Sequence, residues 1–345
     1  MQKWLLLFGI MALLLAASCG RSETATVPVL KDAAAYRADA EKGDAEAQWN
    51  LGVCYIKGKG VKQDYQEAAK WCQKAAEQGH FKAQLILSCF YAKGIGVAQD
   101  DEEAAYWEKK AEKSTEMAIE ELQKAAKRGD AKAQHRLGWF YRNGIIVREN
   151  TDEAIEWYRE AADQGYAPAQ CGLGMCYLAW PNYEAAFVWI QKAVDQGFAP
   201  AQFLLGMCYA EGDGVERDPQ KAFELFRKAA KQDFAPAQYS LGECYATGKG
   251  VEKDQKKALK WIQKAADQGF ARAQLALAKR YERGEGVEKD PEKAFKWCKE
   301  AAKTGDEEAL SKLEQYYHRG IGKKRDLEEV GTQAVVFLLL KHLED

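Results

Sequence analysis

Histidine and cysteine are the side chains with which this 345-residue chain could do chemistry, because they bind metals and act as bases or nucleophiles. The four histidines are scattered and lack the spacing of a metal site: His80, His135, His318 and His342. The sequence contains no G-x-S-x-G, S-x-x-K, H-E-x-x-H, C-x-x-C or phosphate-loop motif. We therefore predict a protein that is not an enzyme and that needs no metal or other cofactor.

The nine cysteines follow a pattern of their own. Six of them stand beside recurring aromatic residues: Cys54, Cys176, Cys208 and Cys244 before a tyrosine, and Cys72 and Cys298 after a tryptophan. The repeat pattern predicts a small, buried apolar side chain at these positions, and cysteine has such a side chain. Cys54 and Cys72 are expected on facing helices, so this pair is either a disulfide or two buried thiols.

The cysteines recur because the chain itself is repetitive. The pattern that runs from Ala47 to Gly79 returns between Ala237 and Gly269. A marker glutamine identifies each repeat, at Gln48, Gln84, Gln134, Gln170, Gln202, Gln238 and Gln274, with Leu310 in the same place of a last unit. Five of the seven intervals are 36 residues long. A unit of this size cannot close a core alone, so the repeats are expected to stack.

Apolar residues within one repeat have helical spacing. Ala47, Leu51 and Cys54 lie four and three residues apart, and Ala68 and Cys72 resume this spacing after a loop. The loop begins with a glycine suited to end a helix and ends with an aspartate or asparagine suited to begin one. Each repeat is therefore predicted to be a helix hairpin.

Two intervals depart from the regular length. Between Gln84 and Gln134 the chain has 14 extra residues, and the segment 109–123 contains no glycine or proline. Fourteen residues make about four helical turns, so we predict that the second helix of this repeat is lengthened and returns in phase. The interval from Gln170 to Gln202 is shorter than the others. It lacks the Gly-x-Gly-Val loop, which Leu178–Asn182 replaces.

The pattern AQ-x-x-LG-x-x-Y-x-x-G-x-GV-x-x-D, followed by A-x-x-W-x-x-x-AA-x-x-G, resembles the Sel1-like repeat, a relative of the tetratricopeptide repeat. The likeness extends over 32–326 and departs from the usual glycine at Ile146 and Asp233. It implies an all-α, right-handed superhelical solenoid of about seven full repeats with terminal capping helices. Residues 327–345, with the apolar run Ala334–Leu340, form a predicted helix that either covers the last repeat or docks a partner.

The N-terminus predicts export. An apolar stretch from Trp4 to Ala17 follows Lys3 and is too short to span a bilayer of about 30 Å, so residues 1–18 are interpreted as a signal peptide. The run LAASCG around Cys19 resembles a bacterial lipobox. It implies lipid attachment to Cys19, a tether over 19–31 and a place at the outer membrane facing the periplasm, because Gly20 and not aspartate follows the cysteine. The alternative is an ordinary secretory signal with Cys19 incidental.

The formal charge of −2 gives no attraction to nucleic acid. Without catalytic motifs or a strong net charge, the predicted functional feature is a binding surface. Likeness to tetratricopeptide repeats implies a concave groove built from the positions after the marker glutamine, after the helix glycine and after the tyrosine. The candidate groove residues differ from repeat to repeat: Trp49, Val53, Ile56, Leu85, His135, Trp139, Arg142, Met175, Leu178, Phe203, Met207, Tyr239, Glu243 and Lys279. The alternative is that some of them, the first position above all, only pack between neighbouring helices.

Three hypotheses about function follow. The first is a lipid-anchored scaffold whose groove binds a peptide or protein segment, a role that rests on the family likeness. The second is a protein that binds or processes peptidoglycan, with Trp49, Trp139 and Phe203 stacking on sugar rings. The third is a spacer that holds the C-terminal helix away from the membrane.

Overall fold

The computed structural model describes residues 32–144, 147–179, 182–321, 330–334 and 336. The predicted signal peptide, Cys19 and the tether lie outside these residues. In the described part every regular element is a helix, and none of these helices is both long and apolar enough to cross a membrane. The prediction of an all-α repeat fold is confirmed.

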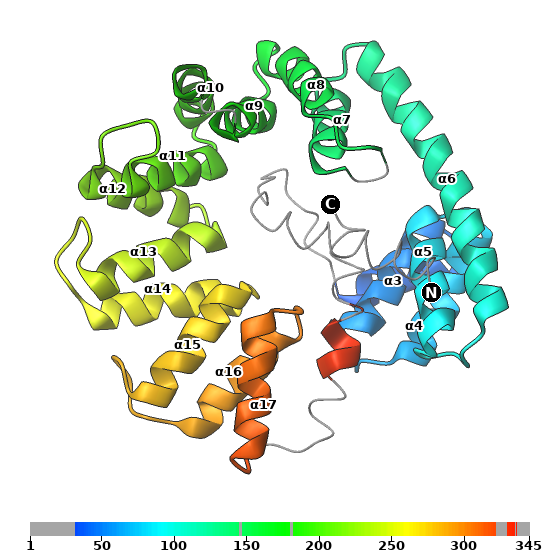
Figure 1. Ribbon diagram of the computed structural model, residues 1–345. Helices are drawn as coiled ribbons and strands as arrows, with labels where there is room; N and C mark the ends of the chain where they lie inside the picture. The colour runs from blue at the N-terminus through cyan, green and yellow to red at the C-terminus, as the bar shows by residue number, and fades with distance from the viewer. Residues whose placement is uncertain (1–31, 145–146, 180–181, 322–329, 335, 337–345) are drawn as a thin grey trace. The chain divides into compact units, whose positions relative to one another are not determined.

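The helices follow one another along the chain (Figure 1), and all those described have 12 or 13 residues except the short α2 and the long α6. Their bounds are α2 (Ala33–Glu41), α3 (Ala45–Lys57), α4 (Tyr65–Glu77), α5 (Phe81–Lys93), α6 (Asp101–Lys127), α7 (Ala131–Asn143), α8 (Thr151–Asp163), α9 (Ala167–Ala179), α10 (Tyr183–Asp195), α11 (Ala199–Glu211), α12 (Pro219–Ala230), α13 (Ala235–Thr247), α14 (Gln255–Asp267), α15 (Ala271–Arg283), α16 (Pro291–Ala302) and α17 (Glu307–His318).

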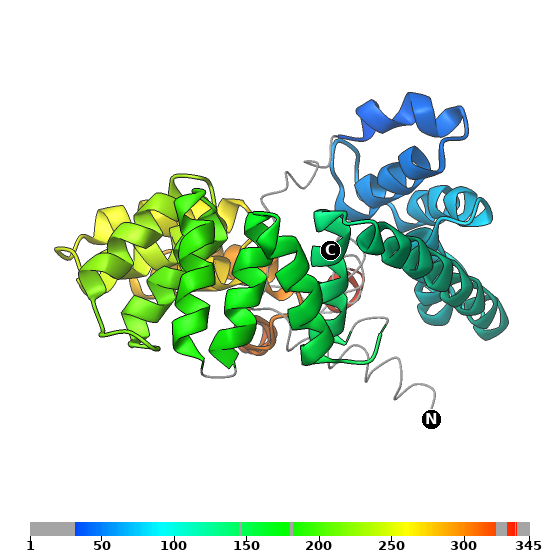
Figure 2. The same cartoon turned by 90° about the horizontal axis from the view of Figure 1, so that it is seen from above.

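The described chain forms two compact units, which divide between Lys124 and Ala125. We call the part over 32–124 the N-terminal unit and the part over 125–336 the C-terminal unit. In the C-terminal unit each odd-numbered helix from α7 to α15 packs against the even-numbered helix that follows it, and that helix packs against the next odd-numbered helix. These hairpins lie along an arc in Figure 1, and Figure 2 shows the green ones as a row of neighbouring helices.

The two irregular repeats have the predicted lengths. α6 has 27 residues where α4 and α8 have 13, so the 14 inserted residues lengthen the helix and form no loop. The division between the two units falls inside this lengthened helix. α9 ends at Ala179 and α10 begins at Tyr183, which confirms the shortened connection in that repeat.

Polar caps and glycines set the helix ends as the sequence predicts. The carboxylate of Asp254 accepts the backbone N–H of Lys257 at 2.9 Å and begins α14. Gly248 ends α13 with a left-handed φ of 79°. Asp233 stands where other repeats have glycine and keeps a φ of 58°, so the turn is retained although an L side chain rarely adopts it.

A second loop glycine joins neighbouring repeats. Gly250 has a φ of 71°, and a Cβ there would lie 2.0 Å from the carbonyl oxygen of Pro219, at the start of α12. Gly96 makes the same approach to the carbonyl oxygen of Tyr65 in the N-terminal unit. The loop of one hairpin therefore packs against the second helix of the preceding hairpin through backbone alone.

The marker glutamines are buried hydrogen-bonding groups. The amide of Gln238 donates to the carbonyl oxygen of Ala230, near the end of the preceding helix, at 3.3 Å. Its own amide oxygen accepts from Gln268, at the end of its hairpin, at 2.7 Å. The same glutamine pair occurs in four further repeats: Gln48 with Gln78, Gln134 with Gln164, Gln170 with Gln196, and Gln202 with Gln232. Each pair satisfies buried polar groups between hairpins.

Part of the predicted C-terminal helix is described. Residues 330–334 and 336 are helical, and Val330 is buried in one cluster with Leu313 and Tyr316 of α17. At this residue the segment covers the last repeat. The remainder of 327–345 lies outside the described residues, so its role as a cap or as a docking element stays a prediction.

Candidate functional site

Each aromatic candidate that directly follows a marker glutamine contacts another aromatic ring. Trp49 stacks on His80 with ring centroids 5.4 Å apart, and Tyr239 lies 5.7 Å from Phe270. The other pairs are His135 with Tyr158 and Tyr166, and Phe203 with Phe226 and Phe234. These side chains hold successive helices together and keep little free surface.

The N-terminal unit offers little of the predicted groove. Trp49, Val53 and Ile56 are only 4%, 1% and 4% exposed, and Leu85 is half-buried. This narrows the candidate surface, because a buried side chain cannot contact a partner unless the structure opens. His135 is also buried and is excluded from the candidate binding surface for the same reason.

The accessible candidates lie on odd-numbered helices of the C-terminal unit. We call them the odd-helix stripe: Trp139 and Arg142 of α7, Met175 and Leu178 of α9, Met207 of α11, Glu243 of α13 and Lys279 of α15. Met207 is the most open of them, with 38% of its surface exposed, and the others are half-buried. The stripe is apolar over α9 and α11, carries an arginine at α7 and is charged at α13 and α15.

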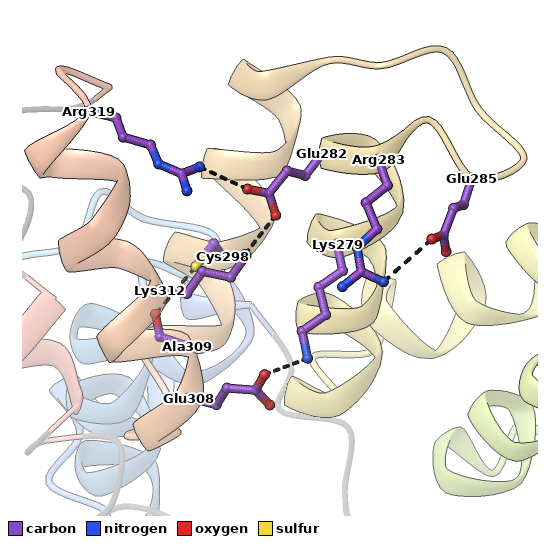
Figure 3. A network of polar contacts seen from close by, with 9 residues as sticks. All are labelled: Lys279, Glu282, Arg283, Glu285, Cys298, Glu308, Ala309, Lys312 and Arg319. Carbon is purple, nitrogen blue, oxygen red and sulfur yellow. Dashed lines mark hydrogen bonds and ion pairs between the residues drawn. The ribbon is translucent and has the colours of Figure 1, made fainter.

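The charged end of the stripe is paired within the protein (Figure 3). Lys279 reaches Glu308 of α17, and Lys312 of α17 lies 2.6 Å from Glu282 of α15. Arg319 approaches Glu282 at 3.2 Å. Burial opposes ionisation of Glu282, but the two cations outweigh it and hold the pKa of this carboxyl below its usual value. These ion pairs join α15 to α17. Because the charges of this end are paired within the protein, it attracts a charged partner only weakly.

Arg280 is a second basic residue of α15, and sequence reasoning missed it. It is 6% exposed and occupies the position that Cys244 has in the preceding repeat. Its guanidinium donates to the side-chain oxygen of Gln255 at 3.0 Å and lies 3.6 Å from the carboxylate of Glu243. The available signal was a charged residue at a position that is otherwise apolar.

Tyr158 is the second residue whose role sequence reasoning missed. It is fully buried on α8, at the place that Ile262 has on α14. Its ring fills the space beside two glycines, since a Cβ at Gly138 or Gly172 would lie 2.8 or 2.9 Å from it. Burial raises the pKa of Tyr158, and the charge and hydrogen bond of Arg142 partly oppose that shift.

Arg142 thus links α7 to its neighbours. One guanidinium nitrogen, Nη1, donates to the sulfur of Met175 on α9 at 3.9 Å, and the guanidinium lies near enough to Tyr158 on α8 to oppose the rise of that phenol's pKa. Among the described residues no carboxylate lies within ion-pair distance of it. Within the described part of the chain, the stripe therefore has a cation at α7 without a carboxylate partner.

Cys54 and Cys72 are buried and are not joined by a disulfide in the structure, and most of the other described cysteines are buried as well. Burial raises the pKa of Cys72 and of Cys171 to about 12, so neither is a thiolate near neutral pH. In the described part of the chain no three histidine, cysteine or acidic side chains gather in a way that would hold a metal.

Comparisons with known proteins agree with the repeat architecture. The Sel1 repeat profile matches residues 45–80, 81–115, 131–166, 167–179, 180–198, 199–234, 235–270 and 271–306. No curated protein gives a significant match.

Solved structures with the same fold come from several bacteria. A Sel1 repeat protein from Oxalobacter formigenes is 34% identical, covers 81% of this chain and 78% of its own, and gives a TM-score of 0.50. A protective antigen present in uropathogenic Escherichia coli strains is 30% identical, with a TM-score of 0.47. The match covers 88% of this chain but 64% of the antigen, so this chain spans less than two thirds of that protein.

Proposed function

Because this chain belongs to the Sel1 repeat family, whose members are generally protein–protein interaction scaffolds, we propose that it is a non-enzymatic scaffold of the bacterial envelope. Lipid on Cys19 anchors it at the outer membrane facing the periplasm, and the odd-helix stripe binds a segment of another protein. The lipobox-like run supports the anchor, and the likeness to tetratricopeptide repeats supports a concave binding face.

One observation carries the binding surface. Met175, Leu178 and Met207 form an apolar, partly exposed row on neighbouring odd-numbered helices, while the scaffold positions of those helices are buried. Methionine and leucine adapt to the shape of an apolar partner, and apolar side chains on an exposed face mark interaction surfaces.

The peptidoglycan hypothesis has less support. Trp49 is buried against His80, so its ring is not free to stack on a sugar, and the half-buried Phe203 packs against Phe226 and Phe234. Of the three aromatic residues that motivated the hypothesis, Trp139 alone keeps a place on the stripe.

A crosslinking pull-down from intact envelopes tests the scaffold proposal. The chain offers a matched pair of variants, Met207→Glu on the stripe and Val188→Glu on α10, where Val188 is 52% exposed. We expect a discrete protein partner with wild type and with Val188→Glu, and its loss with Met207→Glu. Circular dichroism checks that both variants are folded.

Two results would contradict the proposal. Equal capture by both variants would place the binding surface away from the stripe. Recovery of wall fragments alone would favour the carbohydrate hypothesis.

A further inference from the structure

Arg142 is an exception among the basic residues of the odd-numbered helices. In the described part of the C-terminal unit, four basic residues of these helices are buried or half-buried: Arg142, Lys279, Arg280 and Lys312. Lys279, Arg280 and Lys312 each have a carboxylate partner within 4 Å. Arg142 has none there, and its guanidinium lies near the thioether of Met175 and the phenol of Tyr158.

The surroundings of Arg142 include two residues that the other repeats lack, a tyrosine on α8 and a glycine on α9. Tyr158 stands where other hairpins have a side chain without a hydroxyl group, such as Ile262, Cys298 or Phe226. Gly172 makes room for its ring, at a place where the next repeat has Leu204. The contact of Nη1 with the sulfur of Met175 at 3.9 Å and the neighbouring buried phenol of Tyr158 restrict the rotamers of the arginine. The cation is therefore held in place before any partner binds.

An arginine in this position has capacity left for an anion. A guanidinium carries five N–H donors, and the contacts with Met175 and Tyr158 use only part of them. Withdrawing a charge from water without a counter-ion is unfavourable, so a partly buried cation gains from an anion that arrives with a ligand. The apolar side chains of Trp139 and Leu178 reduce the local screening and strengthen such a pair.

We propose that Arg142 binds the side-chain carboxylate of an aspartate or glutamate in the partner segment. An apolar residue next to that acid packs on Met175, Leu178 and Met207. This inference rests on the proposed function, in which the stripe binds a protein segment. It adds that the recognised sequence combines one acidic residue with apolar neighbours, because the stripe itself combines one uncompensated cation with apolar side chains.

Selection from a random peptide library tests this specificity. Twelve-residue peptides displayed with their C-termini fused to the carrier offer only side-chain carboxylates, and they are selected on the detergent-solubilised full chain. We expect enriched peptides with aspartate or glutamate at a fixed distance from one or two large apolar residues. Replacing that acid by its amide is expected to weaken binding to wild type by about tenfold, the size of one charge-assisted hydrogen bond.

A double-mutant cycle assigns the effect to Arg142. In Arg142→Gln the acid and its amide are expected to bind within about twofold of each other, because the charge that distinguishes them is gone. Arg136→Gln is the matched control, since Arg136 is an exposed arginine of the same helix that lies off the stripe. It should retain the tenfold preference. Arg142→Lys supplies a second test should removal of the charge unfold the chain, and it should keep a reduced preference for the acid.

The outcomes separate this inference from the proposed function. Peptides that lose affinity for Met207→Glu but show no coupling between their acid and Arg142 would overturn the inference and leave the binding surface intact. Peptides whose binding is indifferent to Met207→Glu, or a failure to enrich any peptide, would count against the binding surface and hence against both.

Discussion

Gly250 has two separate reasons to be glycine. Its φ of 71° lies in the left-handed region, and a Cβ would approach the carbonyl oxygen of Pro219 to 2.0 Å. Gly248, two residues earlier, shares only the first reason, since its φ is 79° but the nearest atom, on Lys253, would be 3.5 Å away. The two positions therefore separate backbone strain from the contact between repeats.

We expect Gly250→Ala to lower the free energy of unfolding substantially more than Gly248→Ala does. Gly248→Ala should cost about 1 kcal/mol through its left-handed backbone. Gly250→Ala adds a clash with backbone that cannot move without shifting α12, so a cost of about 3 kcal/mol or more is expected. Urea unfolding followed by circular dichroism measures both. Equal losses would show that the contact with Pro219 contributes nothing to stability.

Thr304 marks a repeat in which the glutamine pair is broken. It stands where Gln232 stands two repeats earlier, and Gln232 donates to Gly197 and to Gln202 at 2.9 Å each. Without that donor the buried amide oxygen of Gln274 has no hydrogen-bond partner among the described residues.

Thr304→Gln is therefore expected to stabilise the chain by about 1 kcal/mol, because it supplies a donor to a buried acceptor. Thermal unfolding should show a higher midpoint. Thr304→Ala serves as the control, since it removes the short bond from the threonine hydroxyl to Ala301 and adds no donor. A midpoint for Thr304→Gln at or below that of Thr304→Ala would contradict the assignment.

At the scale of the helix, three aspartate N-caps make stability depend on pH. The pKa of Asp218, Asp254 and Asp290 is held below its ordinary value, first by a backbone N–H of the first turn and then by the lysine three residues on. A carboxyl whose pKa is depressed in the folded state contributes its full stabilisation above its unfolded pKa of about 4. That contribution is lost as the pH falls through the lower, folded pKa.

We therefore expect a thermal midpoint that is nearly constant from neutral pH down to about 5 and falls below about 4. The triple variant Asp218→Asn, Asp254→Asn and Asp290→Asn should lose less on acidification, because asparagine caps a helix without titrating. Asn150 and Asn182 already act in this way on α8 and α10. An unchanged acid dependence in the triple variant would assign the loss to other carboxyl groups.

Helices were predictable from sequence because their signals are local. The caps at Asp254 and Asn150, the helix-ending Gly248 and the lengthened α6 all depend on residues within a few turns. The glutamine pairs were not predictable, because their partners lie 26 or 30 residues apart and meet only when the two helices of a hairpin pack together. The burial of Val53 and Ile56 is likewise a property of neighbouring elements, so a pattern that varies between repeats does not by itself indicate an exposed surface.

At the scale of the whole chain, positions that recur in the repeats and positions that vary between them have different roles. The glutamine pairs, caps and loop glycines recur and build the hairpins in both units. The residues that break the pattern, such as Tyr158, Arg280 and Gly172, gather on or beside the odd-numbered helices of the C-terminal unit. A scaffold of this kind acquires a partner by changing a few side chains on a frame that stays the same.

The proposed anchor makes a prediction for the full chain. If Cys19 carries lipid, more than one acyl chain holds the protein at the membrane, and such an anchor is stable where a single chain is not. The wild-type protein should then sediment with membranes and partition into the detergent phase of a Triton X-114 extract. Cys19→Ser removes the lipidated thiol, so it should abolish the lipid's mass increment and prevent membrane anchoring by that lipid.

Cys89→Ser is the matched control, because Cys89 is a half-buried thiol of α5 and lies far along the chain from the lipobox-like run. It should partition as wild type does. Intact-mass measurement of the detergent-extracted protein decides the matter independently of partitioning, since each acyl chain adds a defined mass to the N-terminal fragment. A Cys19→Ser chain whose mass and partitioning match wild type would overturn the anchor, and the scaffold would then have to reach its partner as a secreted protein.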